Sequence, residues 1–264
     1  MLRRQISEVG NLSGDARLTA AQKAALAKLR ASNSLDDALS ALDFLRQLSP
    51  APEILSELAQ IMKANRYTAR AIGTGGAIAV IAGDESPKLD AAFRPLLQDS
   101  DPQIRYGAAY ALAQVLKGKA GLDVIRVAVE ELKSADDNVR VGGLTTLQNS
   151  GEDPKMGTSR VTTASLGPAA GEATAALLDI AKNSQRTDVR DSALAMLHGL
   201  NPDLTQMDPA LQESFKQSQQ MTDFIEKVLA GQASRAEIIE GLKQFPKAAP
   251  KVAPLLDSRG HDAQ

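Results

Sequence analysis

The sequence predicts an all-α fold of repeated helical hairpins, and three observations support this. Residues 89–116 contain two segments joined by the turn Asp99–Pro102, and in each segment apolar residues recur at spacings of three and four. This is the period of a helix with one buried face. The pattern recurs along the chain every 35 residues. Aromatic residues make up only 3% of the chain, which suits closely packed helices better than a sheet.

The period is clearest where an apolar residue is followed by an arginine at the start of each second helix. This step occurs at Arg70, Arg105, Arg140 and Arg190, here called the repeat arginines, at intervals of 35, 35 and 50 residues. The last interval equals one period plus 15 residues. A single hairpin buries too little surface to be stable, so units of this kind stack until neighbours cover one another.

The segment Leu96–Arg105, with its aspartate turn and its Ile-Arg step, resembles the repeat unit of the HEAT-repeat family. The resemblance covers about residues 50–200 and implies an α-solenoid, commonly an interaction scaffold. It indicates a fold more than a function, because proteins of that family have many roles. The arginines of this step usually form hydrogen bonds within and between repeats, so the resemblance implies a structural role for the repeat arginines, reaching turn acids such as Asp99 and Asp101.

Residues 1–49 are expected to form a lead-in followed by a helix pair that covers the first full repeat. Thr19 and Ser34 each open a capping pattern, which predicts helices to about Arg30 and through Leu48. The pair lacks the apolar-arginine step, so we interpret it as a terminal unit.

The repeats themselves are expected within residues 50–200. Pro95 removes a backbone hydrogen bond inside one first helix, so a bend is expected there. Another repeat should open with Ser86 as the N-cap and Pro87 in the first turn. The predicted units are 53–82, a second beginning at 86, 122–148 and 168–200.

An insertion at Asn149–Gly167 separates the last two repeats. It is polar, contains Gly, Ser and Thr throughout, and follows neither helical nor strand periodicity. Loops of this length within compact folds are usually functional or disordered. We interpret it as a surface excursion and as a second candidate contact with a partner.

The 35-residue period does not continue into residues 201–264. Helices are expected from Asp208 to Gly231, from Ser234 onward, and over Val252–Leu256. Their apolar sides should cover the open end of the fourth repeat, because terminal units need a polar outer face.

Few motifs could support catalysis. The run Gly73–Gly76 suggests a phosphate loop, but it has neither the spacing of a dinucleotide-binding fingerprint nor the Gly-Lys-Ser/Thr ending of a P-loop. The period places Gly73 in register with Ala108 and Gly143, which favours close helix packing. The two histidines, His198 and His261, have no nucleophile or metal-ligand pattern beside them. We therefore predict no enzyme activity, no cofactor and no metal.

The predicted contact surface lies on the side of the second helices opposite the apolar stripe. Tyr106 and Tyr110 fall there, and tyrosine is a rigid amphipathic anchor enriched at interfaces. An alternative is that both tyrosines only cover neighbouring helices. The full set of predicted partner-binding residues is Tyr106, Tyr110, Thr145, Gln148, Asp191 and His198.

The predicted function is a non-catalytic scaffold or adaptor that binds another protein or a peptide on the concave face of the solenoid. One alternative is nucleic-acid binding, as in HEAT-like DNA glycosylases, although 30 basic and 32 acidic residues give a net charge of −2 and the predicted groove is not basic. A second alternative is a lyase or chaperone like the HEAT-type phycobilin lyases, which hold a small cofactor.

Features that bear on the compartment are few. No apolar run approaches the roughly 18 residues that span a bilayer. The basic start Met1–Gln5 is not followed by the apolar segment of a signal peptide. We expect a cytoplasmic protein, or a periplasmic or secreted one if a signal peptide has been removed; the sequence does not determine the oligomeric state.

Overall fold

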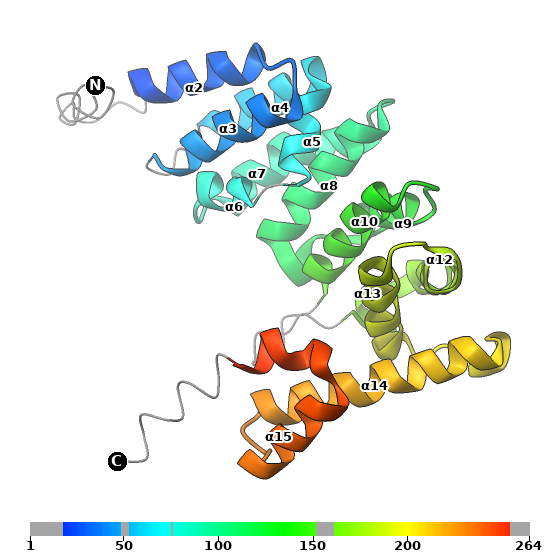
Figure 1. The fold of residues 1–264 in the computed structure, drawn as a ribbon. Helices are drawn as coiled ribbons and strands as arrows, with labels where there is room; N and C mark the ends of the chain where they lie inside the picture. Colours follow the sequence, from blue (N-terminus) through cyan, green and yellow to red (C-terminus); the bar gives the residue numbers. More distant parts are fainter. Residues whose placement is uncertain (1–17, 49–52, 75, 152–160, 254–264) are drawn as a thin grey trace, which may run out of the picture.

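The computed structural model describes residues 18–48, 53–74, 76–151 and 161–253, and every regular element in these ranges is a helix (Figure 1). The predicted all-α class is therefore confirmed. The predicted lead-in before residue 18 and the end of the predicted helix Val252–Leu256 lie outside the described residues. None of the described helices is both long and apolar enough to cross a bilayer.

In the described residues from α2 to α13, successive helices pack in pairs: α2 with α3, α4 with α5, α7 with α8, α9 with α10, and α12 with α13 (Figure 1). Within this part, α8 packs against α5 on one side and α10 on the other, and α9 packs against α12. The elements are α2 (Ala20–Arg30), α3 (Leu35–Arg46), α4 (Ile54–Ala64), α5 (Arg66–Ile72), α6 (Ala77–Ala82), α7 (Ser86–Phe93), η1 (Arg94–Gln98), α8 (Pro102–Leu116), η2 (Lys117–Lys119), α9 (Leu122–Leu132), α10 (Asp137–Ser150), α11 (Thr163–Leu166), η3 (Gly167–Ala169), α12 (Ala170–Asn183), α13 (Thr187–Leu197) and η4 (His198–Leu200).

Several helices begin at the side-chain caps that the sequence predicts. Thr19 and Gln22 form a reciprocal capping box at α2, with the Thr19 amide donating to Gln22 Oε1 at 2.8 Å. Ser34 caps α3 by accepting a hydrogen bond from a backbone amide of the first turn. The start of α7 differs from the prediction, because Ser86 is already the first helical residue and no side chain caps this end.

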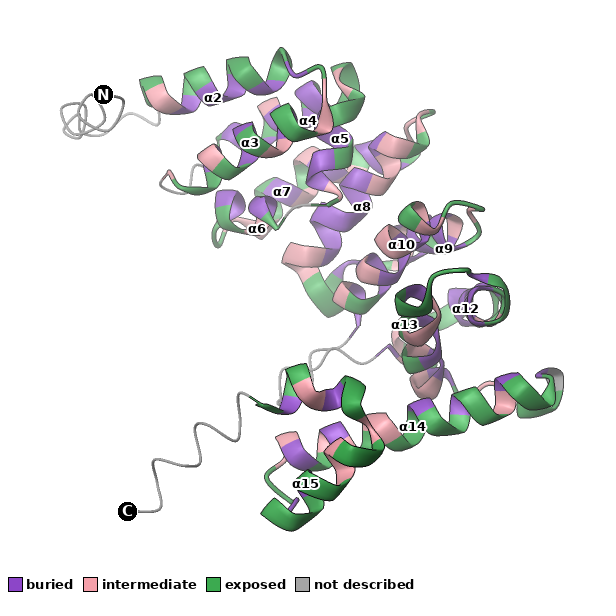
Figure 2. Ribbon diagram, in the orientation of Figure 1, coloured by how far each residue is buried: buried purple, intermediate pink, exposed green. Residues whose placement is uncertain are grey.

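The buried apolar residues form two long clusters that meet at α9 (Figure 2). The first runs from Ala25 on α2 to Val127 on α9, so the N-terminal helix pair shares a core with the hairpins that follow it. The second runs from Ile125 on α9 to Phe215. Because α9 contributes residues to both clusters, it joins the two cores along the chain.

The C-terminal helices cover the last hairpin only in part, which corrects the expectation from sequence. They comprise η5 (Leu204–Gln206), α14 (Pro209–Leu229), α15 (Arg235–Gln244) and η6 (Pro246–Ala248), with residues 249–253 also helical. Leu211 and Phe215 of α14 join the second core, whereas Ile225 and Val228 join Ile238 in a separate small core. α14 has 21 residues, whereas α13, against which its first part packs, has only 11. The second part of α14 therefore extends past α13 and packs against α15.

The second helix of the first full repeat is broken, which the sequence reading did not predict. α5 ends at Ile72, Gly73 is its C-cap, and α6 begins only at Ala77. Gly73 nevertheless lies where α5 and α8 approach closely: an added Cβ would lie 3.4 Å from Cα of Gly107, and one on Gly107 would lie 2.4 Å from the carbonyl oxygen of Ala69. Gly143 also fits the packing interpretation, because its Cβ would lie 2.8 Å from the carbonyl oxygen of Ala128.

Two irregular segments have clear physical causes. At Pro95 the α-helix gives way to the 3-10 helix η1, as expected for a residue without an amide hydrogen. The predicted insertion at 149–167 is shorter than expected, because α10 continues to Ser150 and Val161 and Leu166 are buried in the second core. Residues 152–160 of the insertion lie outside the described residues.

Candidate binding cleft

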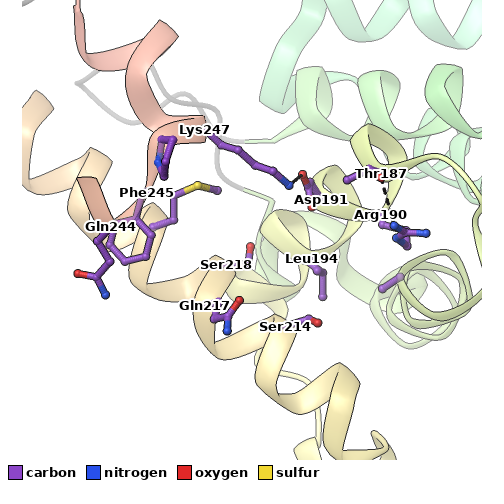
Figure 3. A pocket seen from close by; sticks show the side chains of 13 residues that line it. Thr187, Arg190, Asp191, Leu194, Ser214, Gln217, Ser218, Gln244, Phe245 and Lys247 are labelled. Atoms are coloured by element: carbon purple, nitrogen blue, oxygen red, sulfur yellow. Dashed lines mark hydrogen bonds and ion pairs between the residues drawn. The ribbon is translucent and has the colours of Figure 1, made fainter. Parts of the chain in front are cut away.

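A cleft of about 440 Å³ lies between α13, the middle of α14 and the turn that follows α15 (Figure 3). It is here called the C-terminal cleft. α12 and α13 provide Ala181, Thr187, Arg190, Asp191 and Leu194; α14 provides Ser214, Gln217, Ser218 and Met221; the end of α15 and the segment that leads into η6 provide Gln244, Phe245, Pro246 and Lys247.

The walls of the cleft are fixed by tight packing behind them. α14 begins at the Asp208 cap and is held by the buried ring of Phe215. α15 approaches α14 so closely at Gly241 that an added Cβ would lie 2.1 Å from Cε2 of Phe224. Phe224 in turn contacts the ring of Phe245, with the ring centres 5.9 Å apart. Phe245 is thereby held at the cleft.

An ion pair links two sides of the cleft. Lys247 Nζ donates to Asp191 Oδ2 at 2.6 Å, which joins the turn after α15 to α13 (Figure 3). The two side chains are 63% and 38% exposed, so the pair adds little stability of its own. Its main consequence is local, because it neutralises both charges at this point of the cleft.

Arg190 is the other cation in the cleft, and it contacts only neutral acceptors among the described residues. Its Nη1 donates to the carbonyl oxygen of Ser184 at 2.8 Å and its Nη2 to Thr187 Oγ1 at 3.2 Å. The remaining wall is apolar or uncharged. Ser218 is 9% exposed, and its hydroxyl forms no hydrogen bond with a described residue.

The predicted contact residues are divided between this cleft and the neighbouring helices. Asp191 lines the cleft. His198 is half-buried behind it and meets Phe215 edge to face at 4.9 Å. Thr145 and Gln148 lie on α10; the Thr145 hydroxyl donates to its own helix at the Val141 carbonyl oxygen, and Gln148 is exposed. The structure therefore does not gather the predicted set at one site.

Tyr110 is not available for contact, which corrects the prediction for this residue. It is 8% exposed, and its hydroxyl accepts a hydrogen bond from Gln114 Nε2 at 2.9 Å. α8 lies between α5 and α10, so the side opposite its apolar stripe is also covered. Tyr106 is half-buried and donates to Glu130 Oε1 at 3.3 Å. Burial first, and then the nearby carboxylates, raise the pKa of Tyr106 to about 12.

Two repeat arginines connect one hairpin to the next. Arg105 Nη1 donates to the Asp99 carbonyl oxygen at 2.7 Å, and its guanidinium also pairs with Glu130 on α9. Arg140 pairs with Asp137 in its own hairpin and with Asp179 on α12, both at 3.1 Å. In the turn after η1, Arg105 thus reaches backbone oxygens and not the aspartate carboxylates.

Arg70 does not have the structural role assigned to it. It is exposed, and its guanidinium forms no hydrogen bond or ion pair with a described residue. The cause is the turn before it, which consists of Asn65 alone. The Asn65 side chain caps α5 and donates to the Ser32 carbonyl oxygen at 2.9 Å, so this turn is joined to the preceding helix pair by asparagine and not to the following one by arginine.

A buried carboxyl group at Glu131 was missed from sequence. Glu131 is 5% exposed, and its Oε2 has no hydrogen-bond partner among the described residues. Burial, and then the neighbouring Glu130, raise its pKa well above the ordinary value. The 35-residue period could have predicted this burial, because Glu131 is in register with the apolar residues Leu96 and Ile61, which are both buried.

The described side chains form no group of three or more His, Asp or Glu that could hold a metal ion. No family model matches this chain, and none of the curated proteins matches it. The functional argument therefore depends on the geometry of the chain itself.

Proposed function

We propose that this protein is an α-solenoid of HEAT-like hairpins that acts as a non-catalytic scaffold, and that it binds a segment of another protein in the C-terminal cleft. The observation that carries the proposal is the cleft itself, open to solvent and lined by hydroxyl, amide and apolar groups together with one arginine that pairs with no carboxylate of the described residues. Mixed surfaces of this kind bind peptides through backbone hydrogen bonds and side-chain pockets.

The solenoid part of the proposal is supported by the stacked hairpins and by the contacts of Arg105 and Arg140 between them. The choice of a protein partner over nucleic acid follows from the charge of the cleft. Of its two cations, Lys247 is already paired with Asp191. A groove that tracks a phosphate backbone needs several free cations.

Selection from a random peptide library tests the proposal directly. Wild type should enrich defined peptides, and Ser214→Trp should lose them, because Ser214 is exposed and lines the cleft. Ser192→Trp is the matched control. Ser192 is also exposed and also donates to the carbonyl four residues earlier, but it does not line the cleft. Equal enrichment by the two tryptophan variants, or no enrichment by wild type, would refute the proposal.

A further inference from the structure

Two of the four repeat arginines, Arg105 and Arg140, make the same kind of contact with the next helix pair, whereas exposed Arg70 and cleft-lining Arg190 do not. Arg105 on α8 reaches Glu130 on α9, and Arg140 on α10 reaches Asp179 on α12. In both cases the arginine lies near the start of a second helix, and the acid belongs to the first helix of the next hairpin. Each guanidinium thus has a carboxylate from the following unit.

Arg190 is the last repeat arginine and has only half of these contacts. Like Arg105, it donates to the turn before its own helix. No described acid pairs with it. The helix that follows is α14, whose cleft residues are all neutral: Ser214, Gln217, Ser218 and Met221.

The remaining charges in the cleft do not supply the missing carboxylate. Asp191 is next to Arg190 in sequence, but its carboxylate pairs with Lys247. Of the cations lining the cleft, Arg190 is therefore the one without a described carboxylate partner. The cleft lining also contains the apolar side chains Leu194 and Met221 and the buried Ser218 hydroxyl, which has no described partner.

We propose that the C-terminal cleft binds an acidic peptide segment, and that an aspartate or glutamate of the partner pairs with Arg190 as Glu130 and Asp179 pair with Arg105 and Arg140. A guanidinium and a carboxylate form a charge-assisted, directional hydrogen-bonded pair. An apolar side chain next to the acid packs against Met221. This inference rests on the proposed function and specifies its ligand.

The residues enriched from the random library separate the two proposals. Wild type should enrich peptides with an acidic residue beside an apolar one. The affinity of such a peptide, measured by fluorescence anisotropy, should fall about tenfold or more in Arg190→Gln, since a charge-assisted hydrogen bond is lost. Arg70→Gln should leave the affinity unchanged, because Arg70 is exposed and far from the cleft lining.

A second pair of variants leaves Arg190 and its turn intact. Ser214→Glu should weaken binding of the same peptide, and Ser214→Lys should strengthen it, because the two substitutions are similar in size and opposite in charge. Circular dichroism establishes that each variant is folded. Peptides enriched without an acidic residue, or enrichment of basic peptides, would overturn the inference and leave the proposed function standing. Absence of any enriched peptide would overturn both.

Discussion

Replacing Arg105 by alanine should destabilise the protein, whereas replacing Arg70 should not, although the sequence places both at the same point of the repeat. Arg105 donates to the carbonyl oxygens of Asp99 and Ser100 at 2.7 and 3.2 Å and pairs with Glu130. Arg70 is exposed and has no such contacts among the described residues. The comparison therefore tests whether contacts or sequence register determine the role of a repeat arginine.

The expected loss follows from the contacts of Arg105. Its side chain is 18% exposed and that of Glu130 is 42% exposed, so water can partly replace the ion pair. Two hydrogen bonds to the turn contribute about 1 kcal/mol each, and a partly exposed ion pair adds at most about 1 kcal/mol. The sum is about 2–3 kcal/mol, or about 4–12 °C in melting temperature for a chain of this size. Arg70→Ala should stay within about 0.5 kcal/mol of wild type.

Urea denaturation followed by the helical circular dichroism signal measures this difference as a change in midpoint at constant slope. Arg105→Lys serves as a further control. The lysine side chain keeps the positive charge, but it lacks the planar guanidinium that donates to both the turn and Glu130. The stability of Arg105→Lys should therefore lie between that of wild type and that of Arg105→Ala. Equal stability of Arg105→Ala and Arg70→Ala would refute the reasoning.

Two further predictions concern glycine packing and the buried carboxyl group. Gly107→Ala should lower the free energy of unfolding by about 1–3 kcal/mol, because the new Cβ would lie 2.4 Å from the Ala69 carbonyl oxygen. Gly171→Ala is the control: its new Cβ would meet nothing within 4 Å, so it should leave stability unchanged or raise it slightly. The urea midpoints of the two variants measure this difference. Glu131 is protonated in the folded state above the ordinary pKa of 4.5, so stability should fall as the pH rises from about 4.5 towards its raised pKa, by at most about 1.4 kcal/mol per pH unit. Glu131→Gln should remove this slope in thermal unfolding measured over a pH series, and an unchanged slope would contradict it.

The helical class and most helix starts could be predicted because they depend on local chemistry. The caps at Thr19, Asp208 and Ser234 need only a side-chain oxygen within a few residues of the first free amides. The apolar period likewise identifies one buried face of each helix. These signals lie within single helices, so one sequence is enough to find them.

The candidate site could be predicted only in small part because it depends on neighbours. Tyr110 has the sequence position of an exposed residue and is buried by adjacent helices. Arg70 has the position of a structural residue and is exposed, because its turn is shorter. The cleft depends on Phe245 and Lys247, which lie outside the repeats and are brought to α13 by the packing of α15 on α14. No periodicity relates those residues to Asp191.

Arg190 differs from the other repeat arginines in its surroundings. The guanidinium groups of Arg105 and Arg140 are already paired with acids of the next helix pair, and Arg70 is exposed without lining the cleft. At Arg190 the next unit is α14, which follows a different sequence pattern and presents neutral side chains to the cleft. Under the proposal made above, a carboxylate from the bound peptide therefore occupies at Arg190 the position that Glu130 and Asp179 occupy at Arg105 and Arg140.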